Sequence, residues 1–224
     1  MRTDDENTGL GKTRMDALSD GIFAVALTLL VLEVKPKKIA AIDVWWAELW
    51  PQAIAFIASF LIVGTYWIAH HNECRLIRRT DRWLLWLNLL FLLSIVLVPF
   101  ATGLLSVNWW TDGSQWNRQI PVWVYTGNLI LVGLTLEAVW QYAKRRGYFD
   151  ASLSKSPGKS QIVETTIRNL FAPCLYFIAA MAASVSLGRW LAVVVPFLYI
   201  AYLVWSGRRG LLERLQSVSS ESRK

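Results

Sequence analysis

The first apolar run of the chain carries an unusual set of polar side chains where it begins. Arg14, Asp16, Ser19 and Asp20 lead into an aliphatic stretch that closes with Glu33. An ionisable group at membrane depth is costly, so it normally faces a partner or water and marks a functional site. A simpler interpretation of Asp20 is a carboxylate favoured by the positive end of the helix dipole. We therefore expect any chemistry of this chain to centre on its first helix.

Enzymatic and metal chemistry lack their usual residues. No serine or cysteine is placed with a base as a plausible nucleophile. The only histidines, His70 and His71, are adjacent, so on a helix they point about 100° apart and make a poor metal pair. Cys74 and Cys174 are too few for a disulfide framework or a zinc site. We expect neither an enzyme nor a bound cofactor.

Six apolar runs are candidates for membrane spans. They cover residues 17–34, 50–71, 83–107, 119–143, 169–187 and 190–206. With 54% hydrophobic and 17% charged residues, the composition favours an all-α membrane protein with six transmembrane helices per chain. Residues 1–206 are expected to form one transmembrane domain, followed by a basic cytoplasmic tail over 207–224. The last two runs are short, and a re-entrant pair is the alternative to two crossings.

The distribution of lysine and arginine predicts the orientation. Eighteen of the 23 lie before the first run, in 72–82, in 144–168 or after 206, and five lie on the opposite side. Positively charged loops stay cytoplasmic, so both termini are expected there, in a multi-pass protein of the cell membrane. Short basic clusters between apolar runs are typical of this topology and argue against nucleic acid as a partner. The connection 144–168 is expected to be a flexible loop.

Helical spacing places aliphatic residues of the first span on one stripe. Its members are Leu18, Ile22, Val25, Leu29 and Leu32, with Thr28 at the edge. Such a stripe can simply face lipid or neighbouring helices. Alternatively, it can line an axis where several copies meet and form a dry constriction, which gates ions by dewetting. The pattern alone leaves both interpretations open.

The polar residues at the start of this helix need partners from other spans. We expect those partners in 67–72, which contains both histidines, and at Asn88 of the third span. For His70 the alternatives are a packing role and the handling of protons or ions. The sequence does not say whether His70 or His71 turns inward.

Several motifs together resemble one known family. They are Arg14-x-x-x-Leu-Ser-Asp-Gly21, the Leu-Thr-Leu-Leu-Val-Leu-Glu33 run, Tyr66-Trp-x-x-His-His71, the stretch 78–92 and Val98-Pro-Phe100. This set resembles the transmembrane protein 175 family, the lysosomal-type potassium channels and their prokaryotic relatives. The resemblance is dense over 12–102 and weaker beyond. The signature departs at Leu18, where the family usually has phenylalanine.

The resemblance implies a homotetrameric cation channel in the bilayer whose first helices surround the pore. It implies an aliphatic constriction at Val25, Leu29 and Leu32, with Thr28 as a polar ring beside it. It also implies a network that ties the first helix to its neighbours. The members of that network are Arg14, Ser19, Asp20, His70 and Asn88.

The expected mechanism is a wide pore that narrows to aliphatic rings. The filter sequence Thr-Val-Gly-Tyr-Gly is absent, so selectivity by a cage of carbonyl oxygens is not available. Potassium, the expected permeant ion, would then be only modestly preferred, with Glu33 making the outer mouth negative. The alternative is a proton-coupled secondary transporter that uses Asp20 and His70 as a relay. Transporters usually show repeated halves and broken helices, and neither is evident here.

Overall fold

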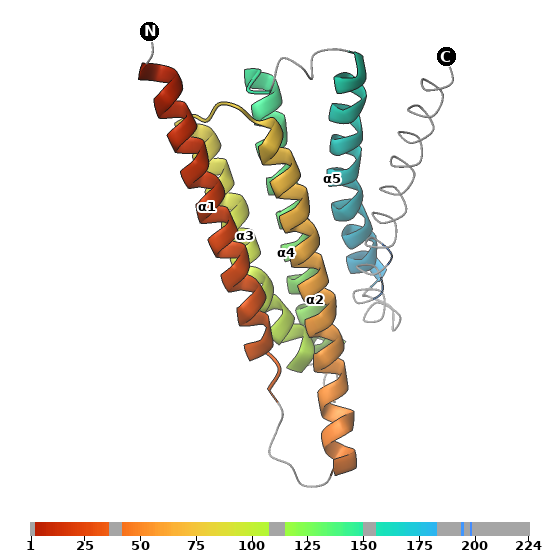
Figure 1. The fold of residues 1–224 in the computed structure, drawn as a ribbon. Helices are drawn as coiled ribbons and strands as arrows, with labels where there is room; N and C mark the ends of the chain where they lie inside the picture. Colours follow the sequence, from red (N-terminus) through yellow and green to blue (C-terminus); the bar gives the residue numbers. More distant parts are fainter. Residues whose placement is uncertain are drawn as a thin grey trace, which may run out of the picture.

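The computed structural model describes residues 3–35, 42–107, 115–149 and 156–182, together with positions 194 and 198. Five helices run antiparallel in succession through these residues (Figure 1). They are α1 (Thr3–Leu32), α2 (Ile42–Leu76), α3 (Arg82–Val107), α4 (Gln115–Arg146) and α5 (Ser156–Ala182). The predicted all-α class is confirmed. The sixth predicted span and the tail over 207–224 fall almost wholly outside the described residues.

The order of packing places α1 and α5 at opposite edges of the described bundle. α1 packs on α2 and α3, α3 packs on α4, and α4 packs on α5 (Figure 1). The core between them is built from large aliphatic and aromatic side chains, among which Trp140, Tyr125, Phe23 and Phe91 are fully buried. Because α1 lies at an edge, the described helices cover only part of its surface.

Several helices are longer than the apolar runs that predicted them. α1 begins at Thr3 instead of residue 17, and α2 begins at Ile42 instead of residue 50. The apolar run measures the part of a helix that can lie in hydrocarbon, whereas helical hydrogen bonding continues into water without apolar residues. Within the described residues, the parts apolar and long enough to cross a membrane are Gly11–Leu32, Leu49–Leu76, Arg82–Ser106 and Gln119–Arg146.

The expectation of a flexible loop over 144–168 is wrong in its second half. α5 begins at Ser156, thirteen residues before the predicted span at 169. Serine followed by Pro157 is a strong start signal, because serine caps the free N–H groups and proline is pre-set for the first helical turn. The sequence therefore contained the signal for this boundary.

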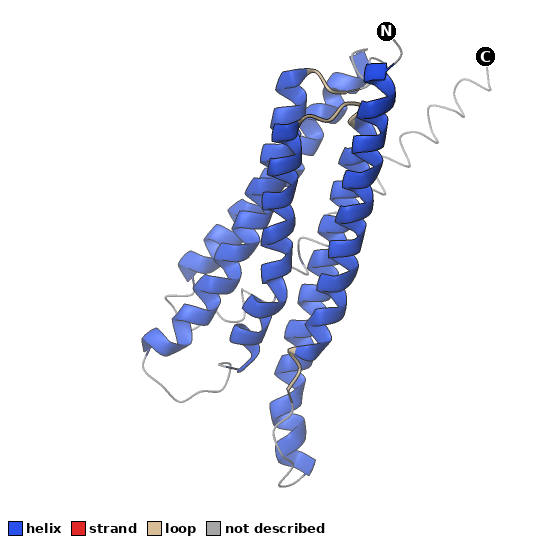
Figure 2. Ribbon diagram, turned by 90° about the vertical axis from the view of Figure 1, so that its left-hand side faces the viewer, coloured by secondary structure: helices blue, strands red, loops and turns tan. Residues whose placement is uncertain are grey.

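Two connections meet at the lysine- and arginine-rich end of the bundle. Figure 2 shows the loops after α2 and after α4 close together at this end, where an isolated bridge pairs Ile77 with Phe149. The N–H of Arg78 donates to the carbonyl of Tyr148 at 2.8 Å. Gly147 has a φ of 65° and closes α4 in the left-handed conformation that glycine adopts without strain. This end is the one predicted to be cytoplasmic.

Asp81 is the central residue of this junction. Its Oδ1 accepts the Leu84 N–H at 2.8 Å, which caps the start of α3. Its Oδ2 accepts the hydroxyls of Tyr142 at 2.6 Å and Tyr148 at 3.1 Å. Partial burial would raise the pKa of the Asp81 carboxyl. The hydrogen bonds from Tyr142, Leu84 and Tyr148 outweigh it, so this pKa lies below its usual range. One carboxylate thus joins α3 to the end of α4.

Acid should weaken this junction. A carboxyl whose pKa is lowered by folding contributes stability above its unfolded pKa, and that stability is lost as the pH falls through the folded pKa. We expect the unfolding temperature to drop as the pH falls below about 4. In Asp81→Asn this acid-dependent drop should be smaller, with a lower stability at neutral pH. Thermal unfolding of the purified protein between neutral and acidic pH would measure this, and equal acid sensitivity in both proteins would contradict it.

Close packing of α4 on α5 depends on a glycine. A Cβ added at Gly133 would overlap the ring of Pro173 and would come within 3.3 Å of the Tyr66 hydroxyl. A proline ring cannot rotate away, so one of the backbones would have to move. Gly127, one and a half turns earlier on the same helix, has open space around its missing Cβ.

Gly133→Ala should therefore destabilise the bundle by about 1–3 kcal/mol, which is typical for overpacking. Gly127→Ala is the matched control and should leave stability unchanged or slightly raised, because alanine favours helix more than glycine does. Unfolding temperatures in the same detergent would compare the two variants. A loss of equal size in both would show that the contact with Pro173 is not the cause.

Candidate functional site

α1 has one face that is buried in the bundle. Met15, Ser19, Phe23, Ala26 and Leu30 are all at most 3% exposed. They recur every three or four residues, which is the spacing of one face of a helix. This face packs on α2 and α3 and fixes the rotation of α1 about its axis.

A neighbouring face of α1 presents the aliphatic stripe that the sequence singled out. Val25, Leu29 and Leu32 are 54%, 38% and 62% exposed. Leu18 and Thr28 are exposed as well, whereas Ile22 is half-buried. The Thr28 hydroxyl donates to the Val25 carbonyl at 2.8 Å, so its proton is used by its own helix and its lone pairs remain outward. The described part of the chain leaves this stripe uncovered.

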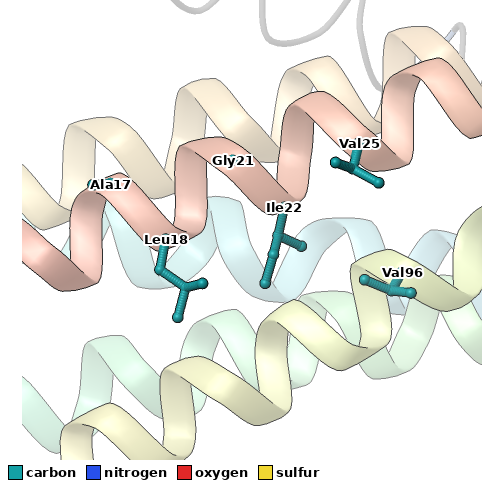
Figure 3. A pocket seen from close by; sticks show the side chains of 6 residues that line it. All are labelled: Ala17, Leu18, Gly21, Ile22, Val25 and Val96. Carbon is teal, nitrogen blue, oxygen red and sulfur yellow. The ribbon is translucent and has the colours of Figure 1, made fainter.

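An apolar groove lies beside the stripe. Figure 3 shows its lining, in which Leu18 and Ile22 of α1 point toward α3, and Val96 of α3 points back toward α1. A second apolar groove continues toward the basic end between Leu18 of α1 and Leu85 and Leu89 of α3, with exposed Arg14 on its rim. The outer surface of the α1–α3 pair is therefore apolar over most of its length.

A buried hydrogen-bond network holds the other face of α1. Asn88 Nδ2 of α3 donates to Ser19 Oγ at 3.1 Å, and Ser19 donates to the Met15 carbonyl at 2.9 Å. Asn88 Oδ1 lies 2.8 Å from His70 Nε2 of α2, so that nitrogen carries the proton. The His70 ring stacks on Phe91 with ring centroids 5.1 Å apart. The structure thus brings together Ser19, His70 and Asn88, three of the five residues expected to form a network.

Asp20 and Arg14 lie outside this buried cluster. Asp20 is exposed, and its Oδ1 accepts the indole N–H of Trp67 at 2.8 Å. Trp67 in turn packs on His71 with ring centroids 5.8 Å apart. His71 is exposed and His70 is 3% exposed, which answers which histidine turns inward. Asp20 therefore has the second helix as its partner, but at the surface.

Glu33 ends α1 against α3. Its carboxylate occupies the space that a Cβ of Gly103 would take, so a larger residue there would force the Glu33 side chain to move. Lys35 Nζ lies 3.3 Å from the same carboxylate, and the Lys35 N–H donates to Gln52 Oε1 at 2.8 Å. The Glu33 carboxylate thus pairs with Lys35 and lies against α3.

Sequence reasoning placed Trp67 in the segment expected to supply a partner for Asp20, but it missed Phe91 and Gly103. Phe91 lies in a motif that the resemblance covered, but its partner depends on how two helices face each other. Gly103 carries no signal beyond being a glycine in an apolar run. Among the residues that the structure describes, no three His, Cys, Asp or Glu side chains form a group that could hold a metal ion.

The sequence matches one family over residues 14–99, described as the endosomal/lysosomal potassium channel TMEM175. A potassium channel of Streptomyces collinus is 30% identical over 78% of this chain and 85% of its own length. A potassium channel of Chamaesiphon minutus is 30% identical over 84% of this chain and 91% of its own length. The human endosomal/lysosomal proton channel TMEM175 is 31% identical, but the match spans only 20% of that protein.

Solved structures share the fold. A lysosomal potassium-selective channel TMEM175 homolog from Chamaesiphon minutus superposes with a TM-score of 0.71, at 26% identity, over 86% of this chain and 97% of that one. The potassium channel MtTMEM175, solved with a nanobody fusion, gives a TM-score of 0.60 over 88% of this chain and 92% of that one. At 17% identity the second likeness concerns the fold alone.

The buried network should be a strong determinant of stability. Asn88→Ala leaves the His70 ring nitrogen without its partner and removes the donor to Ser19, and each such loss costs about 1–3 kcal/mol in a buried site. Asn72→Ala, at an exposed position of α2, is the matched control. We expect a clearly lower unfolding temperature for Asn88→Ala only. Equal unfolding temperatures for the two variants would show that the network does not hold α1.

Proposed function

The chain belongs to the TMEM175 family, and on this premise we propose that it is a potassium channel in which the α1 helices of several copies surround one pore. The observation that carries the proposal is the aliphatic stripe of α1, which the described helices leave exposed beside the α1–α3 groove. Similarity to potassium channels over 85% and 91% of their lengths supports the class. Membership in a channel family also confirms that the chain is not an enzyme.

The described part of a single chain offers one such stripe, and one stripe cannot close a ring alone. We propose four copies around an axis, with α1 of each facing the centre. The apolar α1–α3 grooves beside the stripe would then face either the neighbouring copy or lipid. Residues 1–206 would form this channel domain in the cell membrane, with 207–224 as a cytoplasmic tail.

The constriction is assigned to Val25, Leu29 and Leu32. Their side chains would form successive apolar rings, and a narrow apolar ring empties of water and blocks ions. Opening would require the four α1 helices to separate or rotate until the rings become hydrated. Thr28 lies on the same exposed face, and its outward lone pairs offer a polar ring for a partly dehydrated cation.

The polar residues have supporting roles in this proposal. Ser19, Asn88 and His70 would fix the rotation of α1 and so decide which residues face the pore, with Asp20 and Arg14 at the basic end of the same helix. Glu33 is assigned to the outer mouth. Because Lys35 pairs with Glu33, we expect Glu33 to attract cations only weakly. We also expect selectivity for potassium over sodium to be modest.

The alternative, a proton-coupled transporter with Asp20 and His70 as a relay, has less support. Asp20 is bound to Trp67 at the surface, and His70 is bound to Asn88 in the core. The two residues therefore have separate partners on different helices. Substrate-saturable uptake without channel current would favour this alternative.

The direct test is recording from purified protein in planar bilayers with a potassium/sodium gradient. Leu29→Ala should raise the current about tenfold, which corresponds to a barrier lower by about 1.4 kcal/mol. Leu93→Ala is the matched control, because Leu93 is an exposed leucine of α3 that the proposal places away from the pore. It should conduct as the unchanged protein does.

Two results would count against the proposal. Unchanged current in Leu29→Ala would remove Leu29 from the constriction. Equal increases in both variants would indicate a general loosening of the bundle. A reversal potential that shows no preference for potassium would overturn the assignment of the permeant ion while leaving the channel class intact.

A further inference from the structure

A second polar cluster lies at the basic end of the bundle, on the side away from α1. It is built from Glu73 of α2, Glu137 of α4, and Arg168 and Asn169 of α5. Glu73 is 2% exposed and Glu137 is 7% exposed, although both lie in segments apolar enough to cross a membrane. The pore proposed above uses none of these residues.

Hydrogen bonds connect the three helices through this cluster. Arg168 donates to Glu73 Oε1 at 3.0 Å, and Asn169 Nδ2 donates to the same oxygen at 2.9 Å. Gln141 Nε2 donates to Glu137 Oε1 at 2.6 Å and lies 3.2 Å from the hydroxyl of Thr166. Asn169 also interacts with the carboxyl of Glu137, and Glu137 acts electrostatically on the carboxyl of Glu73.

The charges of the cluster do not balance. The cluster contains two buried carboxyl groups and one guanidinium, which bonds Glu73. Among the described residues, the second oxygen of each glutamate, Oε2, is buried and has no hydrogen-bond partner. Among the other ionisable groups that the structure describes, Lys144 of α4 acts on Glu137 only from an exposed position, and the His70 ring of α2 is bonded to Asn88. An uncompensated carboxylate in a buried site costs several kcal/mol, whereas a bound proton removes both the charge and one unpaired oxygen.

We propose that Glu73 and Glu137 together hold one proton at neutral pH, which makes the cluster a protonatable site that joins α5 to α2 and α4. With that proton the cluster is neutral: one carboxylate pairs with Arg168, and the other is a carboxylic acid. The O–H of this carboxylic acid makes one of the otherwise unpaired Oε2 atoms a hydrogen-bond donor. The site binds a proton from the aqueous phase at the basic end, reached past the partly exposed Arg168 side chain.

The proposal makes stability depend on pH with a definite sign. The unfolded chain holds no proton on these glutamates above about pH 5, because an ordinary glutamate has a pKa of about 4.3. The folded chain holds one. Stability therefore falls as the pH rises from about 5 until the buried proton is lost, and the unfolding equilibrium constant changes by up to tenfold per pH unit.

Infrared spectroscopy tests the proton directly. The full-length protein in lipid at neutral pH should show the C=O stretching band of a buried protonated carboxyl, and this band should shift in heavy water. The band should disappear in Glu73→Gln and in Glu137→Gln, because the remaining carboxylate then pairs with Arg168. Absence of the band at neutral pH would overturn the proposal, as would its persistence in both variants.

Equilibrium unfolding in mixed micelles gives an independent readout. The unchanged protein should lose stability between about pH 5 and pH 8, whereas either glutamine variant should lack this slope. In Arg168→Gln both glutamates should be protonated, so the free energy of unfolding should depend on pH with a slope closer to that of two bound protons. Asp81→Asn is the matched control. The pKa of the Asp81 carboxyl is lowered, so this group affects stability only in acid, and the variant should keep the slope between about pH 5 and pH 8. A slope common to all variants would overturn the proposal. Neither readout depends on ion conduction, so a failure here is distinct from a failure of the proposed channel.

Discussion

A membrane interior has no water to satisfy buried polar groups, so such groups must bind one another. In this protein Ser19, Asn88 and His70 do so across three helices, and that requirement fixes the rotation of α1. A rotation of α1 by 100° would break the Asn88–Ser19 bond, leave the buried Asn88 Nδ2 without its acceptor and turn the aliphatic stripe toward the core. The His70–Asn88 bond joins α2 to α3 and holds Asn88 in place for Ser19. The exposure of Val25, Leu29 and Leu32 therefore follows from the contacts of the buried face of α1.

α2 links two polar sites that serve different helices. Within two turns it contributes Trp67 and His70 to the contacts with α1 and α3, and Glu73 to the contacts with α5. A displacement of the end of α2 would thus change contacts with α1 and α3 on one side and with α5 on the other. Asp81, which caps α3 a few residues later, binds tyrosines at the end of α4 and so limits that displacement. The basic end is held mainly by polar bonds, whereas farther along the bundle apolar packing is supplemented by buried hydroxyl bonds among Ser59, Thr102 and Tyr125.

Local signals in the sequence predicted the helices well where the residues change sharply from polar to apolar along the chain. Apolar runs located α1 to α4, and the resemblance over 12–102 identified the family. Boundaries were less predictable, because a helix that leaves the membrane needs no apolar residues. The start of α5 is the exception, since Ser156 and Pro157 form a recognisable start signal that the search for apolar runs passed over. In the candidate site, Asn88 and the segment around His70 were expected as partners of the first helix, and the structure places them there.

The sequence by itself determined the all-helical membrane class, the family, the end of the bundle that carries the positive charge, and the stripe on the first helix. These are properties of composition and of spacing along one segment. Only the tertiary structure decided that His70 rather than His71 turns inward, that Trp67 is the partner of Asp20, and that Gly103 receives Glu33. It alone paired Glu73 with Arg168, 95 residues away. Such contacts depend on the rotation and depth of each helix against its neighbours, and the spacing of residues within a single helix does not encode either quantity.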